Sequence, residues 1–154
     1  MAMRSAMTLF VLCLGAVPIA GLAQQVSPRG AGNAEFTSWL RQARAGQIAP
    51  LLHAAAACEQ AQGPRDQCLQ VIEQLRRSGE KGTILAQHKL GLLYHLGHIV
   101  PQDYAEAARW SRKAAQRGYA PAQVHLGLLL QTGKGVPQRQ SESLHWYYRA
   151  AEQD

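Results

Sequence analysis

The C-terminal half of this 154-residue chain is one unit of 36 residues written twice. When residues 86–118 are aligned with residues 122–154, 14 of the 33 pairs are identical. Chance at ordinary residue frequencies gives roughly two identities over such a length. The shared positions include a glycine at Gly91 and Gly127 and a tryptophan at Trp110 and Trp146. A period of this length is typical of stacked helical pairs.

The first segment of each unit is expected to be an amphipathic helix. Residues 86–96 contain no proline, and Ala86, Leu90 and Leu93 fall on one helical face. Thr83 is the expected N-cap, and Gly97 supplies the left-handed residue that ends the helix.

The second segment is expected to be a helix that packs closely on the first. It follows Pro101, begins near Asp103 as N-cap and closes at Gly118. A glycine inside a helix costs about 1 kcal/mol relative to alanine. Its recurrence at Gly91 and Gly127 therefore indicates that two backbones approach too closely for a Cβ. We expect the partner surface to be Ala107, Ala114 and their copies, with Trp110 and Trp146 filling the wedge.

These residues resemble the Sel-one-like repeat, a branch of the tetratricopeptide-type α-solenoids. The family's unit runs A-Q-x-x-L-G-x-x-Y, then G-x-G-V, then D, then A-x-x-W-Y-x-K-A-A-x-x-G. The first copy matches at Ala86, Gln87, Leu90, Gly91, Tyr94, Gly97, Val100, Asp103, Ala107, Trp110, Lys113, Ala114, Ala115 and Gly118. The second matches at Ala122, Gln123, Leu126, Gly127, Gly133, Gly135, Val136, Trp146, Tyr147, Ala150 and Ala151. Ile99, Leu130 and Arg139 depart from it, where the family has a loop glycine, a tyrosine and an aspartate.

The resemblance implies an all-α fold, a right-handed α-solenoid of stacked antiparallel helix pairs. Two clear repeats occupy 82–154, and a degenerate helical hairpin region occupies 34–81. Proteins similar to this family serve as adaptors in envelope assembly, signalling and host contact. The first helices of the repeats are expected to line a concave binding face. The partner-binding candidates there are Gln87, Tyr94, His95, Gln123, Leu130 and Gln131.

The N-terminus reads as a secretory signal peptide over 1–23. Arg4 precedes an apolar run over 6–17, and Gly21-Leu22-Ala23 offers the small residues that a signal peptidase reads. The run is too short for a stable membrane-spanning helix. We expect a mature chain from Gln24, with a flexible lead-in over 24–33 and no transmembrane segment, in the periplasm or secreted from a Gram-negative bacterium.

The region before the repeats carries weaker signals of the same kind. Trp39, Ala43 and Gly46 echo the W-x-x-x-A…G end of a unit, with one residue fewer before the glycine. We expect helices over 35–45, 50–62 and 64–78, and we interpret this half as degenerate repeat.

Cys58 and Cys68 each lie five residues from Gly63. An antiparallel hairpin that turns at Gly63-Pro64 brings the two thiols face to face. An oxidising compartment favours a structural disulfide between them. A redox role, free thiols and metal binding are the alternatives, although a C-x-x-C redox pair has a different spacing.

The charge pattern argues against nucleic acid as a partner. The mature chain has 15 Lys and Arg against 10 Asp and Glu, a net charge of about +5. The basic residues are scattered among acidic ones and have no stacking platform beside them. They are expected to form a solvated surface.

No metal site and no cofactor are expected. His88 and His95 share a helical face and His98 lies just beyond it, but the i, i+4 histidine pair of a helical zinc motif is missing. His53, His125 and His145 are likewise expected to be solvated or satisfied by neighbours.

Catalysis has one formal candidate. Ser78-Gly79-Glu80-Lys81 matches the S-x-x-K motif of penicillin-recognising enzymes. Its K-T-G and S-D-N companions are absent, the mature chain is too short for that fold, and no other catalytic constellation stands out. We therefore expect no catalytic residues. Penicillin binding has been attributed to cysteine-rich proteins resembling this family, so a peptidoglycan- or β-lactam-binding or hydrolysing protein is the alternative hypothesis.

The second unit stops at the position equivalent to Gly118, with no polar capping helix after it. Solenoids normally need such a cap over the apolar side of the last repeat. We interpret an uncapped end bearing Leu144, Tyr147 and Tyr148 as a docking surface or a dimer contact, with a merely frayed end as the alternative. The leading hypothesis is an exported, non-catalytic interaction module whose partners are other envelope or secreted proteins.

Overall fold

The computed structural model of the protein describes residues 33–60 and 63–153. The predicted signal peptide and nearly all of the lead-in over 24–33 lie outside the described residues. Within the described ranges the chain forms seven α-helices and no strand. The helices are α1 (Asn33–Arg44), α2 (Ile48–Glu59), α3 (Arg65–Glu80), α4 (Ile84–Leu96), α5 (Tyr104–Gln116), α6 (Ala120–Thr132) and α7 (Gln140–Ala151).

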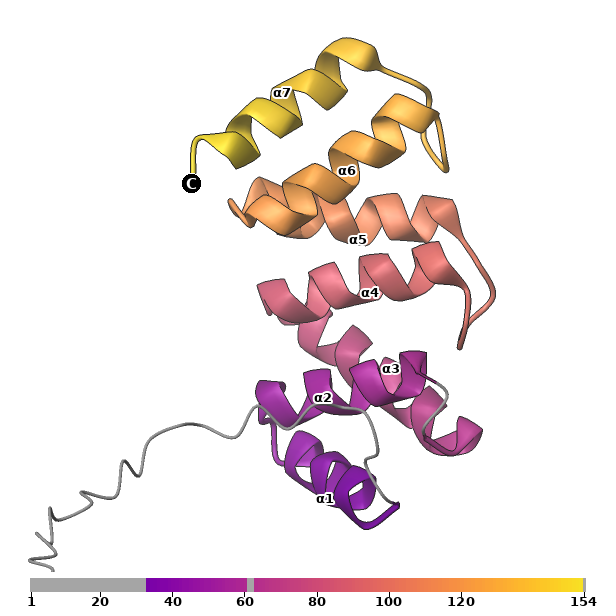
Figure 1. Ribbon diagram of the computed structural model, residues 1–154. Coiled ribbons are helices and arrows are strands. Elements are labelled where there is room, and N and C mark those ends of the chain that lie inside the picture. Colours follow the sequence, from indigo (N-terminus) through magenta and orange to yellow (C-terminus); the bar gives the residue numbers. More distant parts are fainter. Residues whose placement is uncertain (1–32, 61–62, 154) are drawn as a thin grey trace, which may run out of the picture.

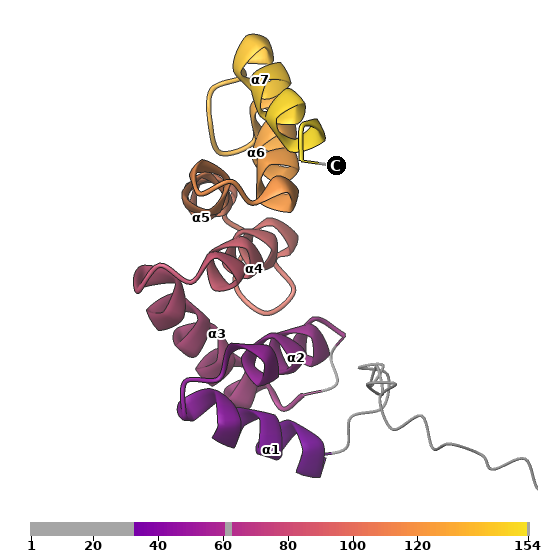
Figure 2. The ribbon, with the colours of Figure 1, turned by 90° about the vertical axis from the view of Figure 1, so that its left-hand side faces the viewer.

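The helices stack in chain order, from α1 at one end of the molecule to α7 at the other (Figure 1). In the view turned by 90°, α3 and α5 lie along one side of the stack, and α2, α4 and α6 lie towards the other (Figure 2). Each helix packs on the next, and α2 also contacts α4. The predicted all-α solenoid of helix pairs is confirmed.

Short-range chemistry sets the helix ends in the two repeated units. The Asp103 carboxylate at the N-cap of α5 accepts two backbone N–H groups of the first turn, at 2.9 and 3.0 Å. Gly97 ends α4 in the left-handed conformation, with φ 73°. Thr83 occupies the N-cap position of α4, but its side chain makes no capping hydrogen bond, so that part of the expectation is wrong. Arg139 has no short acceptor and leaves α7 without a side-chain cap.

The loops inside the two units differ where Ile99 stands in place of a glycine. Gly135 has φ 68° and lies against the backbone of Tyr104, with no room for a Cβ. Ile99 instead packs against the core formed by the N-terminal helices and α4. The departure changes the packing of the loop and leaves the helix pair intact.

Helices α4 and α5 approach each other closely at Gly91. A Cβ built at Gly91 would lie 2.5 Å from Ser111 Oγ and 3.3 Å from the Ala107 carbonyl oxygen. Ser111 is fully buried and cannot move aside without displacing its neighbours. The glycine is therefore required by the close approach, as its cost inside a helix predicts.

The equivalent contact in the second unit has different chemistry. A Cβ at Gly127 would lie 2.7 Å from Cε1 of the Tyr147 ring. The Ser143 hydroxyl donates to the Gly127 carbonyl oxygen at 2.8 Å. The predicted contact of glycine with alanine is therefore found in the first unit, where Gly91 meets Ala107. It is wrong for Gly127, because Ser143 occupies the position equivalent to Ala107.

The tryptophans of the repeat lie between successive units. Trp110 is fully buried, its indole N–H donates to Glu106 at 3.1 Å, and its ring reaches Gly79 of α3. Trp146 packs in a cluster with Ala115 and Leu126. Each ring thus fills the space between its own helix pair and the pair before it.

The repeat geometry extends further towards the N-terminus than the sequence identity does. Gly46, Gly82 and Gly118 are spaced by 36 residues and have φ values of 88°, 94° and 89°. Each follows the second helix of a pair or its equivalent. Helices α2 and α3 therefore occupy the place of a repeat unit, and α1 occupies the place of the second helix of the unit before it.

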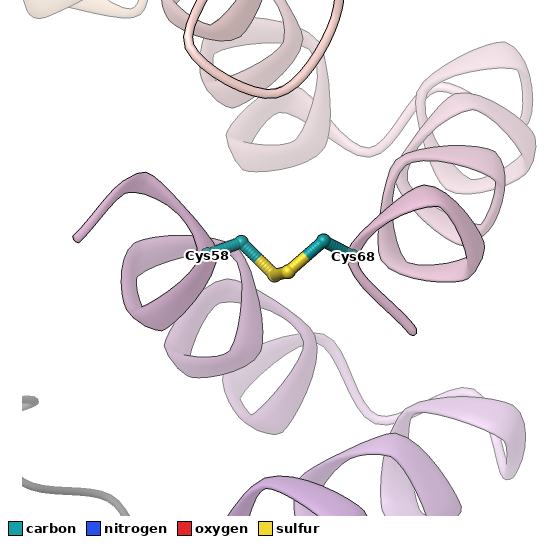
Figure 3. The surroundings of a disulfide bond; sticks show 2 residues. All are labelled: Cys58 and Cys68. Carbon is teal, nitrogen blue, oxygen red and sulfur yellow. A yellow bond between two sulfur atoms is a disulfide. The ribbon is translucent and has the colours of Figure 1, made fainter. Parts of the chain in front are cut away.

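A disulfide joins α2 to α3 near their connection (Figure 3). Cys58 and Cys68 are bonded, and their side chains are buried in the N-terminal core. The predicted structural bridge is confirmed. It closes a loop of ten residues and so restricts the unfolded chain.

We predict that Gly91→Ala destabilises the fold and that Gly127→Ala is nearly neutral. The new methyl at position 91 meets a buried hydroxyl and a backbone carbonyl, and such overpacking typically costs about 1–3 kcal/mol. At position 127 it meets the outer edge of a half-buried tyrosine ring that can rotate. Urea unfolding followed by circular dichroism measures both free energies. Equal losses would contradict the close backbone approach at Gly91.

We predict that replacing both cysteines by serine lowers the free energy of unfolding by about 2–3 kcal/mol, from the entropy of a loop of this length. The helical content at room temperature is expected to remain, because the C-terminal repeats do not depend on the bridge. Thermal melts of the oxidised protein, the reduced protein and the double variant provide the measurement. A double variant as stable as the oxidised protein would contradict it.

Candidate interaction surface

Two contacts one period apart join the successive first helices α2, α4 and α6. Lys89 Nζ lies 2.7 Å from Glu59 Oε2, which links α4 to α2. His125 Nε2 lies 3.0 Å from His95 Nδ1, which links α6 to α4. Residues 59 and 95 are separated by 36 positions, as are residues 89 and 125. The same structural position thus carries a salt bridge at one joint and a hydrogen bond between two imidazoles at the next.

The histidine joint is extended by a third side chain. Ser111 Oγ of α5 lies 2.9 Å from His125 Nδ1, so His125 bonds through both ring nitrogens. The His88 ring lies edge-on to Tyr119 and faces His125, with ring centroids 5.1 and 6.4 Å away. Sequence reasoning missed the part played by His125. Its spacing of 36 residues from Lys89 was the available signal.

The environment of the cluster favours neutral imidazoles. Burial, followed by the neighbouring His95 and His88, lowers the pKa of His125 to about 4. Burial and then Lys134 lower the pKa of His95. Burial and then Lys89 lower the pKa of His88. The joint is therefore hydrogen-bonded and uncharged at neutral pH.

Two of the six candidate partner-binding residues lie inside the protein. The Gln87 side-chain amide donates to the Gly79 carbonyl oxygen at 2.8 Å, and that of Gln123 donates to the Ala115 carbonyl oxygen at 3.2 Å. The two glutamines are 5% and 0% exposed. Each ties a first helix to the end of the preceding second helix. They hold units together and are not available to a partner.

The other four candidates differ in exposure. Leu130 is 1% exposed and belongs to the core around Trp146. Tyr94 is half-buried against two core clusters, and burial followed by Glu106 raises the pKa of its phenol. His95 is half-buried in the joint to α6. Gln131 is exposed, and its side-chain oxygen accepts the Tyr147 hydroxyl at 3.0 Å.

An apolar stripe follows the outward faces of the first helices. On α4 it consists of Leu85, Leu92 and Leu96, and on α6 of Pro121 and Leu128. Leu85, Leu96 and Leu128 are 39%, 43% and 42% exposed. Leu92 and Leu128 occupy equivalent positions of the two units. We call this set the first-helix stripe. It lies on the helix side opposite the buried Leu90 and Leu126. The predicted binding residue Leu130 lies on that buried side, so the sequence analysis did not identify the stripe.

The remaining candidate chemistry is placed as follows. Ser78 lies in the last turn of α3, and Lys81 is the C-cap of that helix. Within the described residues, no group of three or more His, Cys, Asp or Glu side chains is arranged to hold a metal ion. None of the helices in the described ranges combines the length and the apolar character needed to cross a membrane.

These features define an α-solenoid with stacked helix pairs, buried ties between units and an exposed apolar stripe along the first helices. Residues 84–119 and 120–154 each match the family model of the Sel1 repeat. Residues 84–154 are therefore two Sel1 repeats. Sel1 repeats are generally protein–protein interaction modules and typically non-catalytic scaffolds.

Solved structures with the same fold come from several bacteria. A Sel1 repeat protein from Oxalobacter formigenes is 26% identical, with 91% of this chain and 100% of that chain covered and a TM-score of 0.66. The protective antigen c5321 of uropathogenic Escherichia coli strains, which displays an SLR fold, is 34% identical over 77% of this chain, with a TM-score of 0.66. This chain spans 25% of the length of c5321.

Helicobacter pylori cysteine rich protein B is similar in fold alone, with 18% identity, 77% of this chain and 85% of that chain covered, and a TM-score of 0.60. A comparison with curated proteins finds no match.

We predict that acid weakens the fold through the histidine joint. The folded pKa of His125 is about 4, whereas that of an unfolded histidine is about 6.5. The stability it contributes is complete above pH 6.5 and is lost as the pH falls from 6.5 to about 4, because the unfolded chain then takes up the proton more readily. The loss from this residue is on the order of 2–3 kcal/mol.

Urea unfolding of the wild type and of His125→Gln between pH 7.5 and pH 4 measures this effect. We expect a shallower dependence on pH for His125→Gln. The matched control is His145→Gln, at an exposed position of α7, which is expected to keep the wild-type slope. Identical slopes for all three proteins would show that the joint does not control acid stability.

Proposed function

We propose that this protein is an exported, non-catalytic adaptor of the bacterial envelope that binds another protein along the first-helix stripe. The exposed leucines of α4 and α6 are the observation that carries the proposal. Leu92 and Leu128 occupy equivalent positions of the two units, as do Leu85 and Pro121, so the apolar strip repeats with the helix pair. Such a strip matches the contact face of a protein partner.

Three features support export. The N-terminal sequence has the pattern of a signal peptide. The buried Cys58–Cys68 disulfide is of a kind that persists in oxidising compartments such as the periplasm. Solved structures with the same fold include bacterial proteins, one of them a protective antigen.

The partner is proposed to contact α4 and α6 together. His95 and Gln131 of the original candidates remain at or near the surface, about 60° around their helices from Leu92 and Leu128, whereas Tyr94 lies on the opposite side of α4 with Leu90. The His95–His125 bond fixes the spacing between the two helices, so the stripe is presented as one surface. The proposal includes the C-terminal end of the stack, bearing Leu144 and Tyr148, as a second contact surface for a partner or a second copy.

We predict that Leu128→Glu weakens partner capture from a periplasmic extract by at least about tenfold, because it places a charge in the centre of an apolar contact. The matched control is Leu69→Glu on α3, since Leu69 is 47% exposed and Leu128 is 42% exposed. Immobilised wild type and variants, compared by quantitative mass spectrometry, provide the measurement. Equal recovery of every partner by wild type and Leu128→Glu would remove the stripe as the binding surface.

A further inference from the structure

The two ends of the stack have opposite surface character. At the N-terminal end, the exposed side chains of α1 include Glu35, Ser38, Arg41 and Gln42, which form a polar face. At the C-terminal end, Val124 of α6 and Leu144 and Tyr148 of α7 are 48%, 48% and 70% exposed. Figure 1 shows α1 and α7 at opposite ends of the molecule. We call the surface formed by Val124, Leu144, Tyr147, Tyr148 and Ala151 the end face.

The repeat reveals what covers the equivalent surface one unit earlier. Leu144, Tyr147 and Tyr148 correspond to Ala108, Ser111 and Arg112 of the first unit. There, Ala108 is 2% exposed and packs with Leu129, and Ser111 is fully buried against His125. Arg112 donates to Glu142 of the next second helix at 2.9 Å. The end face therefore corresponds by sequence to the surface of α5 that the second unit covers.

The end face of α7 is more apolar than the equivalent surface of α5. Leucine replaces alanine at position 144, and tyrosines replace serine and arginine at positions 147 and 148. A terminal face that contacts only water is normally polar, as the exposed side chains Glu35, Ser38, Arg41 and Gln42 of α1 are. The change towards large apolar side chains indicates a surface that is covered by protein.

The end face contains a hollow, and the equivalent site one unit earlier holds a side chain. It measures about 340 Å³ and lies between α6 and α7, lined by Ala120, Pro121, Val124, Tyr147, Ala150 and Ala151. One unit earlier, the ring of Tyr119 packs beside the corresponding Ala114 and Ala115 and lies edge-on to His88, the counterpart of Val124. The internal version of this hollow therefore takes a tyrosine ring.

We propose that the end face binds the end face of a second copy of this chain, with Tyr148 of each copy entering the hollow of the other. The projecting ring and the hollow lie on the same surface, which is the condition for a self-complementary two-fold contact. Among the residues that the structure describes, the polar face of α1 offers no apolar complement, so a head-to-tail array is not favoured. The inference rests on the proposed role of the C-terminal end as a contact surface.

The charges of α7 are compatible with this contact. Glu142 lies 2.9 Å from Arg112 and 3.3 Å from Arg139. The Arg149 guanidinium lies over the Trp146 ring, 5.6 Å from its centroid. These groups are engaged within their own copy, so the dimer does not require them to be buried without a partner.

The size of the face predicts a weak dimer. A helix of twelve residues is about 18 Å long. Two helices with axes about 8–10 Å apart present a face of roughly 400 Å². This is about half of the area that each partner contributes to a standard interface. We therefore expect a dimer that forms in the micromolar concentration range.

The test is analytical ultracentrifugation of the full chain, expressed in a Gram-negative host and purified as the host processes it. The concentration series runs from low to several hundred micromolar. The wild type is expected to show a reversible monomer–dimer equilibrium. Tyr148→Glu and Leu144→Glu are each expected to weaken it by about 100-fold or more, because every substitution occurs twice in a symmetric contact. Leu69→Glu, at a 47% exposed position of α3, is expected to leave it unchanged.

A wild type that stays monomeric throughout the series would overturn the proposal. A dimer that resists both end-face substitutions, or that Leu69→Glu weakens as much, would overturn it as well. Circular dichroism of each variant shows whether its fold is kept, and two end-face variants are used so that misfolding of one leaves the other decisive. A monomeric wild type that still captures its partner through Leu128 would refute the dimer and leave the adaptor proposal standing.

Discussion

The close approach of α4 and α5 at Gly91 is the constraint on which the arrangement of the repeats depends. Because Gly91 has no side chain, Ser111 lies buried against α4, and its hydroxyl reaches His125 of the next unit. His125 in turn bonds to His95 on α4. The absence of a Cβ at Gly91 therefore makes room for a hydrogen-bonded chain of Ser111, His125 and His95 that joins the two units. This chain links α4, α5 and α6, the helices that border the joint between the two units.

Two kinds of position can be distinguished in this solenoid. Some positions keep both their residue type and their contact, as the buried glutamines at 87 and 123 do, each bonded to a carbonyl eight residues earlier in the preceding helix. Other positions keep their geometry and change their chemistry, from an ion pair at Lys89 to an imidazole pair at His125. The N-terminal pair α2–α3 follows the same plan and adds a disulfide. This explains how a unit keeps its place in the stack after its sequence has diverged.

The fold was predictable because its determinants are local and repeated. The glycines that end α4 and α6, the glycines at 91 and 127 and the tryptophans recur at a fixed period, and each acts through short-range geometry. The binding candidates were harder to predict, because helical periodicity places Gln87 on a polar position and only the three-dimensional contact shows that its amide satisfies a buried carbonyl. The choice of Leu130 over Leu128 failed for a similar reason, since both are leucines and only packing separates the buried one from the exposed one. The interpretation of the N-terminal half as degenerate repeat was based on Trp39, Ala43 and Gly46, and the 36-residue spacing of Gly46, Gly82 and Gly118 was a further signal for it in the sequence.

The two joints between the first helices also respond to different properties of the medium. The Glu59–Lys89 pair is made of opposite charges at partly exposed side chains, so dissolved salt reduces its attraction. The His95–His125 pair is uncharged at neutral pH, so salt has little effect on it and protons disrupt it instead. Salt and acid are therefore expected to weaken different joints of the same stack, salt the joint between α2 and α4 and acid the joint between α4 and α6.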